Sequence, residues 1–482
     1  MKICPIGSRR IDGNGKMMDK IVIVDSAGFF CERQNYAKIT LSAQDYLHRI
    51  GLLLDKMNKD RISHVVIYGD REHFANVGYF TGYDSRFEES LLIIGSDGRK
   101  TILAGNEGMS YSSLIPFEIE RVLYQHFSLQ GQPRDKSAPL FDILKKSDIS
   151  ASGRVGIVGY KYFEEKYFQN PETVFDIPAY ILEEIRRAAG NGNVVNYTAA
   201  LTGLPDGIRM KIHDPKEIAM SEYAAGKCGN VLLNMLDALD VNETELSLTK
   251  KSGAELHPLT VHPMINFGQN AATGLRSPDE TKLKPGDCCG FAYGLRTSLI
   301  ARVGVAAYDF ATYDETLKPY LDTFYKPYWG AVAAWYETVK AGVSGGEVYD
   351  AVMQRIGSPD FGVTLNPGHN IGEDEWTNSP VYKGSKILIG SGSHLQCDII
   401  ASGTNPVRCA ICEDTVVIAD TELREKLKSA FPDVHKRIIA RQKMMREILG
   451  IQIDDSLLPM SNLNGVYFPF MLDTGKIVAK TK

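Results

Sequence analysis

Residues 395–417 read LQCDIIASGTNPVRCAICEDTVV, two apolar runs separated by Gly, Thr, Asn and Pro. Apolar and β-branched runs bounded by such residues predict two buried β-strands. The first run contains the carboxylate Asp398, and the second contains Glu413 followed directly by Asp414. Because a carboxylate inside a strand cannot be left buried and unpaired, each one needs a cation or an ion-pair partner. The stretch therefore predicts a sheet with an acidic centre.

The segments before this stretch extend the same sheet. Three of them predict strands: VHPMINFG (261–268), GDCCGFAYG (286–294) and SLIARVGVA (298–306). Two others have helical periodicity, RMKIHDPKEIAMSEYAAGKCGNVLLNMLDAL (209–239) and KPYLDTFYKPYWGAVAAWYETVKAGV (318–343). Antiparallel strands with a few long helices on one face predict an α+β layer domain, which we place over residues 206–420.

The chain on either side of this domain is predicted to form further parts. In residues 41–60, LSAQDYLHRIGLLLDKMNKD, apolar residues recur at helical spacing after a Ser that can cap a helix. The runs SHVVIYG, SLLIIG and KTILAG then predict buried strands, so residues 41–200 are expected to form an α/β domain. We expect an irregular arm over residues 1–40 and a helical extension over residues 421–482.

Composition narrows the possible partners and location. The chain has 482 residues, too many for one hydrophobic core, and a formal net charge of −5 without long runs of Lys or Arg. We therefore expect two domains and no nucleic-acid partner. The N-terminus lacks the apolar core of a signal peptide, and no run approaches the roughly 18 apolar residues of a membrane span. We expect a cytoplasmic protein without a membrane partner, its eight cysteines reduced.

Several motifs resemble those of a known superfamily. The segment NVGYFTGYDSRFEESLLIIGSDG (76–98) resembles the N-terminal domain of creatinases and aminopeptidases P. The ordered motifs of residues 206–420, including NPGHNIG (366–372) and CEDTVV (412–417), resemble the pita-bread superfamily of creatinases, prolidases, aminopeptidases P and methionine aminopeptidases. The resemblance implies an α+β pita-bread domain preceded by an α/β creatinase-like domain. It also implies a homodimer.

The resemblance further implies a metal site that has lost two ligands. In the metallopeptidase members, two Asp, a His and two Glu hold two divalent ions, with bridging carboxylates between them. Here Ala292 and Leu299 stand at the two Asp positions, whereas His369, Asp398 and Glu413 stand at the other three. Alanine and leucine cannot bind a cation, so a two-ion site is not expected.

Two alternatives remain open for the chemistry of this site. One divalent ion of Zn, Mn or Fe on His369, Asp398 and Glu413 is reasonable, because three N/O ligands with open positions suffice. Without any metal, as in creatinase, a histidine would act as acid and base. That role would fall to His369, His257 or His262, since creatinase's own catalytic position is Leu275 here.

Other residues are expected to line the substrate pocket. Arg302 matches an Arg of the superfamily, and Arg296 and Arg276 are the other cations available to pair with the carboxylates if no metal does. Trp376 follows the Gly-His motif where many peptidases carry a second His, and we expect it to form a pocket wall. Cys409 and Cys412 are predicted to face opposite sides of one strand, as buried apolar residues without redox function.

The function implied by the resemblance is hydrolysis of a C–N bond in a small peptide, amide or amidine. Xaa-Pro aminopeptidases, prolidases and creatinases do such chemistry, but the missing ligands argue against the usual two-metal mechanism. The alternative is a catalytically inactive pita-bread protein that binds a small molecule or a short peptide.

Overall fold

The computed structural model describes residues 20–26, 28 and 32–481, which divide into two compact units. The N-terminal unit comprises residues 40–211 and 372–374. The C-terminal unit comprises the described residues up to Ile39 together with residues 212–371 and 375–482. Both units combine helices with β-sheet.

The N-terminal unit is built on a six-stranded mixed sheet with the order β5-β4-β3-β2-β6-β7. Parallel pairs join β2 to β6, β6 to β7 and β4 to β5, while β3 is antiparallel to both of its neighbours. The strands are β2 (His64–Gly69), β3 (Ser90–Gly95), β4 (Lys100–Ala104), β5 (Glu120–Leu123), β6 (Val155–Val158) and β7 (Val194–Asn196).

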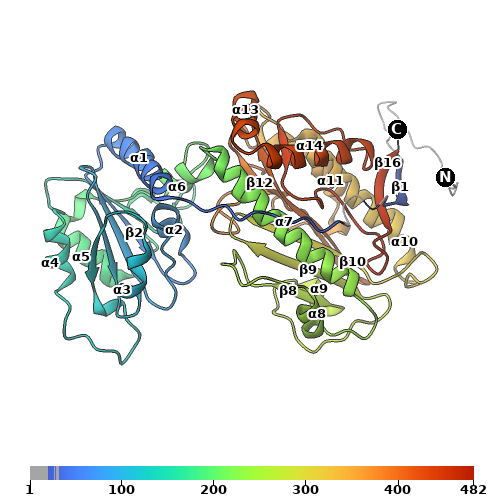
Figure 1. Ribbon diagram of the computed structural model, residues 1–482, viewed down its shortest axis with the longest axis horizontal. Coiled ribbons are helices and arrows are strands. Elements are labelled where there is room, and N and C mark those ends of the chain that lie inside the picture. The colour runs from blue at the N-terminus through green and yellow to red at the C-terminus, as the bar shows by residue number, and fades with distance from the viewer. Residues whose placement is uncertain (1–19, 27, 29–31, 482) are drawn as a thin grey trace. The chain divides into compact units, whose positions relative to one another are not determined.

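Helices cover both faces of this sheet (Figure 1). One face packs against α1 (Ala43–Asp60) and α2 (Ala75–Thr81), and the other against α4 (Leu140–Lys146) and α5 (Ala179–Ala189). Short helices α3 (Gly108–Tyr111) and α6 (Ala199–Thr202) complete the unit. The helix predicted over residues 41–60 is confirmed as α1, and the three predicted strands are confirmed as β2, β3 and β4.

The C-terminal unit is built on an eight-stranded antiparallel sheet. Its main path runs β11-β12-β14-β10-β9-β8, and β13 and β15 also pair with β14. The strands are β8 (Met264–Phe267), β9 (Cys288–Leu295), β10 (Ser298–Val305), β11 (His369–Asn370), β12 (His394–Cys397), β13 (Ile400–Thr404), β14 (Val407–Ile418) and β15 (Leu457–Pro459). All five strands predicted for this domain are therefore present.

The long helices α7 (Pro215–Ala238) and α11 (Lys326–Thr338) pack on one face of this sheet, and the candidate site lies on the other face, where the short helix α9 (Gln269–Thr273) also packs. α7 lies along β9 and β10 (Figure 1), and α11 contributes the fully buried Trp329 and Trp335 to the same core. Phe291 and Tyr293 of β9 point into this core, whereas Ala292 between them belongs to a separate cluster. The remaining helices are α8 (Glu245–Lys251), α10 (Lys318–Tyr320), α12 (Gly345–Ile356), α13 (Thr421–Ala430) and α14 (Pro432–Glu447).

The two outer parts of the chain differ from their predicted character. The arm expected over residues 1–40 contains a strand, β1 (Lys20–Asp25), and its residues 1–19, 27 and 29–31 lie outside the described residues. β1 pairs antiparallel with β16 (Lys476–Thr481), so residues more than 450 positions apart form one small sheet. Residues 421–482 begin with two helices as expected, but they end in β15 and β16 and belong to the C-terminal unit. Of the helices that the structure describes, none has the length and apolar character needed to cross a membrane.

Candidate metal centre

The sheet register brings three of the predicted ligands together on the face away from α7. His369 of β11 pairs with Gln396 of β12, and Gln396 pairs with Thr415 of β14, two residues beyond Glu413. Asp398 follows β12 two residues after Gln396 and so shares its side of the strand. One ligand atom from each of His369, Asp398 and Glu413 lies within 4.8 Å of the other two. All three side chains are buried.

Glycine at position 368 allows β11 to approach β12 this closely. Gly368 has φ +121°, a conformation that other residues rarely adopt. A Cβ at this position would also lie 2.8 Å from the Gln396 carbonyl oxygen and 2.9 Å from Trp335 Nε1. In the Gly-His motif, residue 368 is therefore glycine because the backbone conformation and the close packing require it, whereas His369 supplies the imidazole.

The imidazole of His369 is oriented with Nε2 toward the carboxylates. Its Nδ1 lies 3.1 Å from the carbonyl oxygen of Asn370, a contact that places a proton on Nδ1 and leaves Nε2 as the ring atom that faces the carboxylates. Nε2 lies 3.7 Å from Asp398 Oδ2, 3.7 Å from Glu413 Oε1 and 3.2 Å from Glu375 Oε1. Within the described part of the chain, neither Nε2 nor Asp398 Oδ1 has a hydrogen bond of normal geometry. Buried polar atoms without partners are what a cation would satisfy.

The donor set fits one divalent ion. One imidazole nitrogen and two carboxylates match the preferences of Zn, Mn and Fe, and the contact of Nδ1 with a backbone carbonyl is the usual support of a metal-binding histidine. The set does not fit two ions, because it supplies two buried carboxylates, Asp398 and Glu413, where a two-ion site of this kind uses four.

Burial and mutual charge shift the pKa values of all three residues of the cluster. Burial alone would lower the pKa of His369, but the carboxylates of Glu375, Glu413 and Asp398 outweigh it and raise the pKa to about 10. Burial raises the pKa of Asp398 well above its usual range, and the neighbouring Glu413 raises it further. Burial also raises the pKa of Glu413. A bound dication would therefore displace protons from this centre.

Two residues of the centre were not predicted from the sequence. Gln396 Nε2 donates to the Leu299 carbonyl oxygen (2.8 Å) and to Glu413 Oε1 (3.1 Å), which orients the Glu413 carboxylate. Glu375 provides the carboxylate nearest to His369 Nε2, and 28% of its side chain is exposed. Strand alternation from Asp398 could have identified Gln396. Glu375 lies in an irregular segment, so no periodicity marks it.

Trp376 packs directly on the predicted histidine. Its ring stacks on the His369 imidazole, with centroids 4.1 Å apart and planes 16° apart. The indole therefore covers one face of the imidazole and limits its rotation. Its predicted place in a substrate pocket stays a prediction.

The side of the centre that lacks carboxylates is closed by apolar packing. Ala292, Leu299, Ala301 and Ile371 form one buried cluster. Ala301 pairs with Ala292 on one side and with Glu413 on the other, so this apolar row ends at the acidic group. The two positions expected to hold carboxylates in a two-ion site are therefore filled by packed hydrocarbon.

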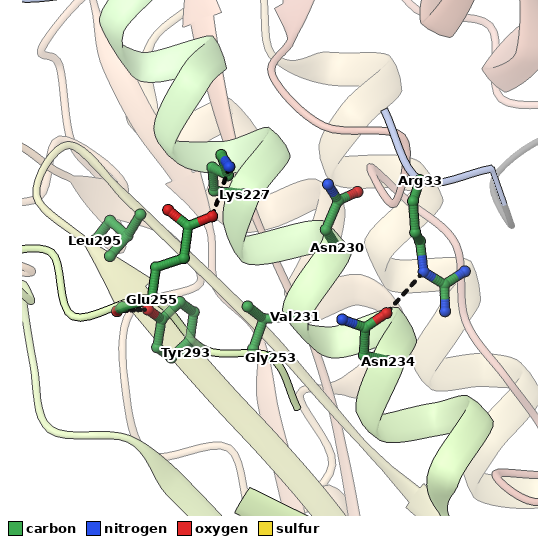
Figure 2. Close-up of a pocket in the computed structure, with 9 residues that line it drawn as sticks. All are labelled: Arg33, Lys227, Asn230, Val231, Asn234, Gly253, Glu255, Tyr293 and Leu295. Atoms are coloured by element: carbon green, nitrogen blue, oxygen red, sulfur yellow. Dashed lines mark hydrogen bonds and ion pairs between the residues drawn. The ribbon is translucent and has the colours of Figure 1, made fainter. Parts of the chain in front are cut away.

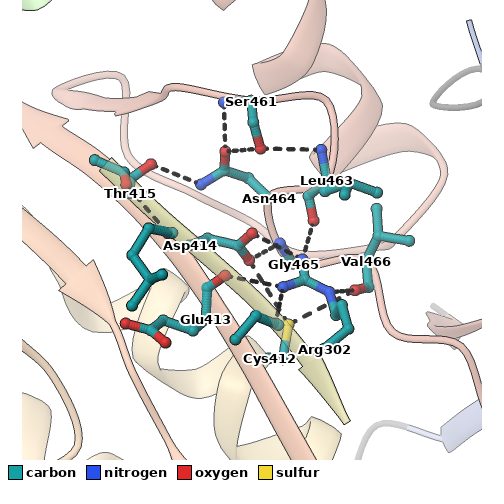
Figure 3. A network of polar contacts seen from close by, with 12 residues as sticks. Arg302, Cys412, Glu413, Asp414, Thr415, Ser461, Leu463, Asn464, Gly465 and Val466 are labelled. Carbon is teal, nitrogen blue, oxygen red and sulfur yellow. Dashed lines mark hydrogen bonds and ion pairs between the residues drawn. The ribbon is translucent and has the colours of Figure 1, made fainter. Parts of the chain in front are cut away.

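The position of Arg302 contradicts its predicted place in the substrate pocket. It pairs with Cys412 in the register and so faces the helix-covered side of the sheet, away from Glu413. Its five N–H donors bind Asp414 Oδ1 and the carbonyl oxygens of four residues: Ala301, Glu413, Leu463 and Val466 (Figure 3). Arg302 therefore stabilises the core by linking β10, β14 and the segment before β16, and it does not line a substrate pocket.

The described contacts of Arg276, His262 and His257 are with residues outside the His369 cluster. Arg276 is exposed and binds Asn270 and Asp279. His262 is exposed, and its Nε2 contacts the Leu275 carbonyl oxygen at 2.9 Å. Arg296 is half-buried in the turn between β9 and β10, and His257 Nε2 lies 2.8 Å from Glu255.

The Cys-x-x-Cys motif is divided between the two faces of β14 as predicted. Cys412 contacts Asp414 and the Val466 carbonyl oxygen on the helix-covered side. Cys409 packs with Cys288, Ala271 and Val303 in another cluster. The six described cysteines are free and buried, and they form no disulfide.

Solved structures share this fold. The Xaa-Pro dipeptidase from Bacillus anthracis has a TM-score of 0.58 at 13% identity, with 78% of this chain and 96% of that chain covered. The X-Pro aminopeptidase from Thermotoga maritima has a TM-score of 0.58 at 15% identity (76% and 94% covered). The prolidase from Pyrococcus furiosus has a TM-score of 0.56 at 15% identity (76% and 96% covered). No protein-family model and no curated protein sequence matches the chain.

Proposed function

We propose that this chain, which shares its fold with Xaa-Pro dipeptidases and prolidases, hydrolyses a C–N bond in a small peptide, amide or amidine with one divalent ion. The ion is Zn, Mn or Fe, bound by His369, Asp398 and Glu413. The observation that carries the proposal is the set of three ligand atoms within 4.8 Å of one another, together with His369 Nε2 and Asp398 Oδ1, which have no hydrogen-bond partner among the described residues.

Each residue of the centre has a role that follows from its position. A bound ion would polarise the substrate carbonyl and lower the pKa of water. Gln396 holds the Glu413 carboxylate in place through its 3.1 Å hydrogen bond, and Trp376 holds the His369 ring by stacking. Glu375, part exposed and 3.2 Å from Nε2, is placed to accept a proton from the substrate side and return it to the leaving nitrogen.

Elemental analysis of the purified chain, paired with a Glu413→Gln variant, tests the proposal. We expect about one equivalent of Zn, Mn or Fe in the parent chain and a large loss in the variant, because glutamine lacks the anionic oxygen. Metal content far below one equivalent, unchanged by the substitution, would exclude the metal-dependent enzyme.

A second candidate is a pita-bread protein that binds a small molecule or short peptide without hydrolysing it. The apolar row of Ala292, Leu299 and Ala301 favours it, because Ala292 and Leu299 replace two of the five usual ligands. A panel of dipeptides, amides and amidines distinguishes the two. Turnover of one compound supports the hydrolase, whereas saturable binding of one compound without turnover of any supports the binder.

The proposal also covers assembly and location. We propose a homodimer in the cytoplasm. Sedimentation equilibrium tests the assembly, and a mass of one chain at micromolar concentration would contradict it.

A further inference from the structure

A cavity of about 250 Å³ lies on the side of β9 opposite to the metal centre (Figure 2). Tyr293 and Leu295 point into it, whereas the alternate residue Ala292 belongs to the apolar cluster beside Glu413. The remaining lining residues come from α7, from the segment after α8 and from the N-terminal segment: Lys227, Asn230, Val231, Asn234, Gly253, Glu255 and Arg33.

The α7 side of the cavity is a polar stripe on a helix that is otherwise largely buried. Lys227, Asn230 and Asn234 are spaced by three and four residues, which places them on one helix face. All three are half-buried, while Val231 beneath them is buried. The stripe therefore presents one ammonium and two amides to a partly open cavity.

Hydrogen bonds from other segments hold these walls in place. Asn230 Nδ2 donates to the Gln34 carbonyl oxygen at 2.9 Å, and Asn234 Nδ2 donates to the Ser252 carbonyl oxygen at 3.0 Å. The Tyr293 hydroxyl donates to the Glu255 carbonyl oxygen at 2.8 Å. A site whose polar groups are already fixed loses little entropy when a ligand binds.

The charges of the cavity are separated along its length. Figure 2 shows Lys227 and Glu255 at one end and Arg33 with Asn234 at the other, with Asn230 and Val231 between them. Lys227 Nζ lies 2.6 Å from Glu255 Oε1, and Arg33 Nε donates to Asn234 Oδ1 at 3.0 Å. Arg33 also pairs with Asp237, so each cation already has an anionic partner.

This balance favours a ligand that carries both charges. The lining carries two cations, Lys227 and Arg33, and one anion, Glu255, so a carboxylate can pair with Arg33 at one end while an ammonium pairs with Glu255 at the other. A zwitterion exchanges partners without changing the net charge. The volume lies below the roughly 300–1,000 Å³ of sites for drug-sized ligands, so the ligand has the size of an amino acid or dipeptide.

We propose that this cavity binds a small zwitterion, a free amino acid or a dipeptide. Its carboxylate lies at the Arg33–Asn234 end, its ammonium lies at Glu255, and its amide, where present, faces Asn230. The site is separate from the metal centre and does not depend on the proposed hydrolysis.

Calorimetric titration of the full chain with glycylglycine tests the ligand class. We expect saturable binding of glycylglycine, and binding at least about tenfold weaker for N-acetylglycylglycine, which lacks the ammonium, and for glycylglycinamide, which lacks the carboxylate. Equal affinity for the three compounds, or no heat of binding at millimolar glycylglycine, would overturn the proposal.

Two substitutions with opposite expected effects separate binding from loss of folding. Glu255→Gln removes the ammonium partner and should weaken glycylglycine binding by about tenfold. Lys227→Met removes the group that competes for Glu255 and should leave binding as tight or tighter. Weaker binding in both variants, or in neither, would overturn the assignment.

A Glu413→Gln variant distinguishes the cavity from the metal centre. Glycylglycine should bind this variant with the parent affinity, because the two sites lie on opposite sides of β9. Loss of binding would place the dipeptide at the metal centre and overturn the proposal, while the outcome of the metal analysis would stay independent of it.

Discussion

Arg302 Nη2 lies 2.7 Å from Asp414 Oδ1, and neither side chain has any exposed surface. Asp414 also accepts from the Tyr336 hydroxyl and from the Gly465 backbone N–H. The pair thus connects β10, β14, α11 and the segment before β16 through groups that all have partners. Removing one partner from such a network leaves a buried charge without compensation.

Arg302→Met is therefore expected to lower the free energy of unfolding by about 3–5 kcal/mol. The methionine fills the volume of the side chain but leaves the Asp414 carboxylate and four carbonyl oxygens without their donor. Urea denaturation followed by circular dichroism measures the change. Arg276→Met at the surface is the matched control and should stay within about 0.5 kcal/mol of the parent.

His394 should make stability depend on pH. It is buried, its Nε2 lies 2.8 Å from the Ser221 hydroxyl, and burial lowers its pKa to about 4. The unfolded chain, with a histidine pKa of about 6.5, binds more protons between these values, so stability is complete above about pH 6.5 and falls as pH drops toward 4. The shift of about 2.5 pH units corresponds to roughly 3 kcal/mol.

Urea titrations of the parent chain and of His394→Gln at several pH values isolate this contribution. The free-energy difference between the two proteins should shrink as the pH falls from 7 to 4. A difference that stays constant over this range would show that His394 does not titrate as inferred.

The double substitution Ala292→Asp and Leu299→Asp should raise the metal content from one equivalent to two. Each aspartate restores a carboxylate beside Glu413, and two neighbouring dications require such bridging groups. Without metal, the new buried carboxylates should lower the melting temperature, and Mn²⁺ should restore it. Ala292→Asp alone is the control, and two equivalents in that variant would contradict the need for both groups.

Glu375→Gln should weaken metal affinity without changing the stoichiometry. The carboxylate lies 3.2 Å from His369 Nε2 but outside the compact set of three ligand atoms. Loss of a supporting group of this kind typically costs about 10–100-fold in affinity. Competition with a chelator measures the constant. Glu375→Asp, which keeps the charge, should lie between the parent and the glutamine variant.

The order of motifs in the sequence predicted which residues form the His369 cluster. It did not predict the direction in which each side chain points. His369, Asp398 and Glu413 come from β11, from the end of β12 and from β14. A short local motif around each residue was enough to predict it as a candidate ligand. Arg302 was misplaced because a motif match does not record strand register. Its pairing with Cys412 turns its side chain to the opposite face from Glu413.

Long-range pairing was the part of the fold that the sequence could not reveal. Lys20 pairs with Thr481, and such partners share no local pattern that links them. The cavity beside α7 was missed for a similar reason. The spacing of Lys227, Asn230 and Asn234 is visible in the sequence, but Glu255 and Arg33 reach the same space only through tertiary packing.

The pairing of β1 with β16 also bears on the order in which the chain folds. Residues 40–211, nearly the whole N-terminal unit, form a continuous segment that can fold while synthesis continues. β1 is made earlier, yet its partner strand does not exist until the ribosome has passed Thr481. During that interval the edge of β1 has no described strand to cover it, and an exposed edge is a template for pairing between chains. Protection of this strand by a chaperone would therefore lower the risk of pairing between nascent chains.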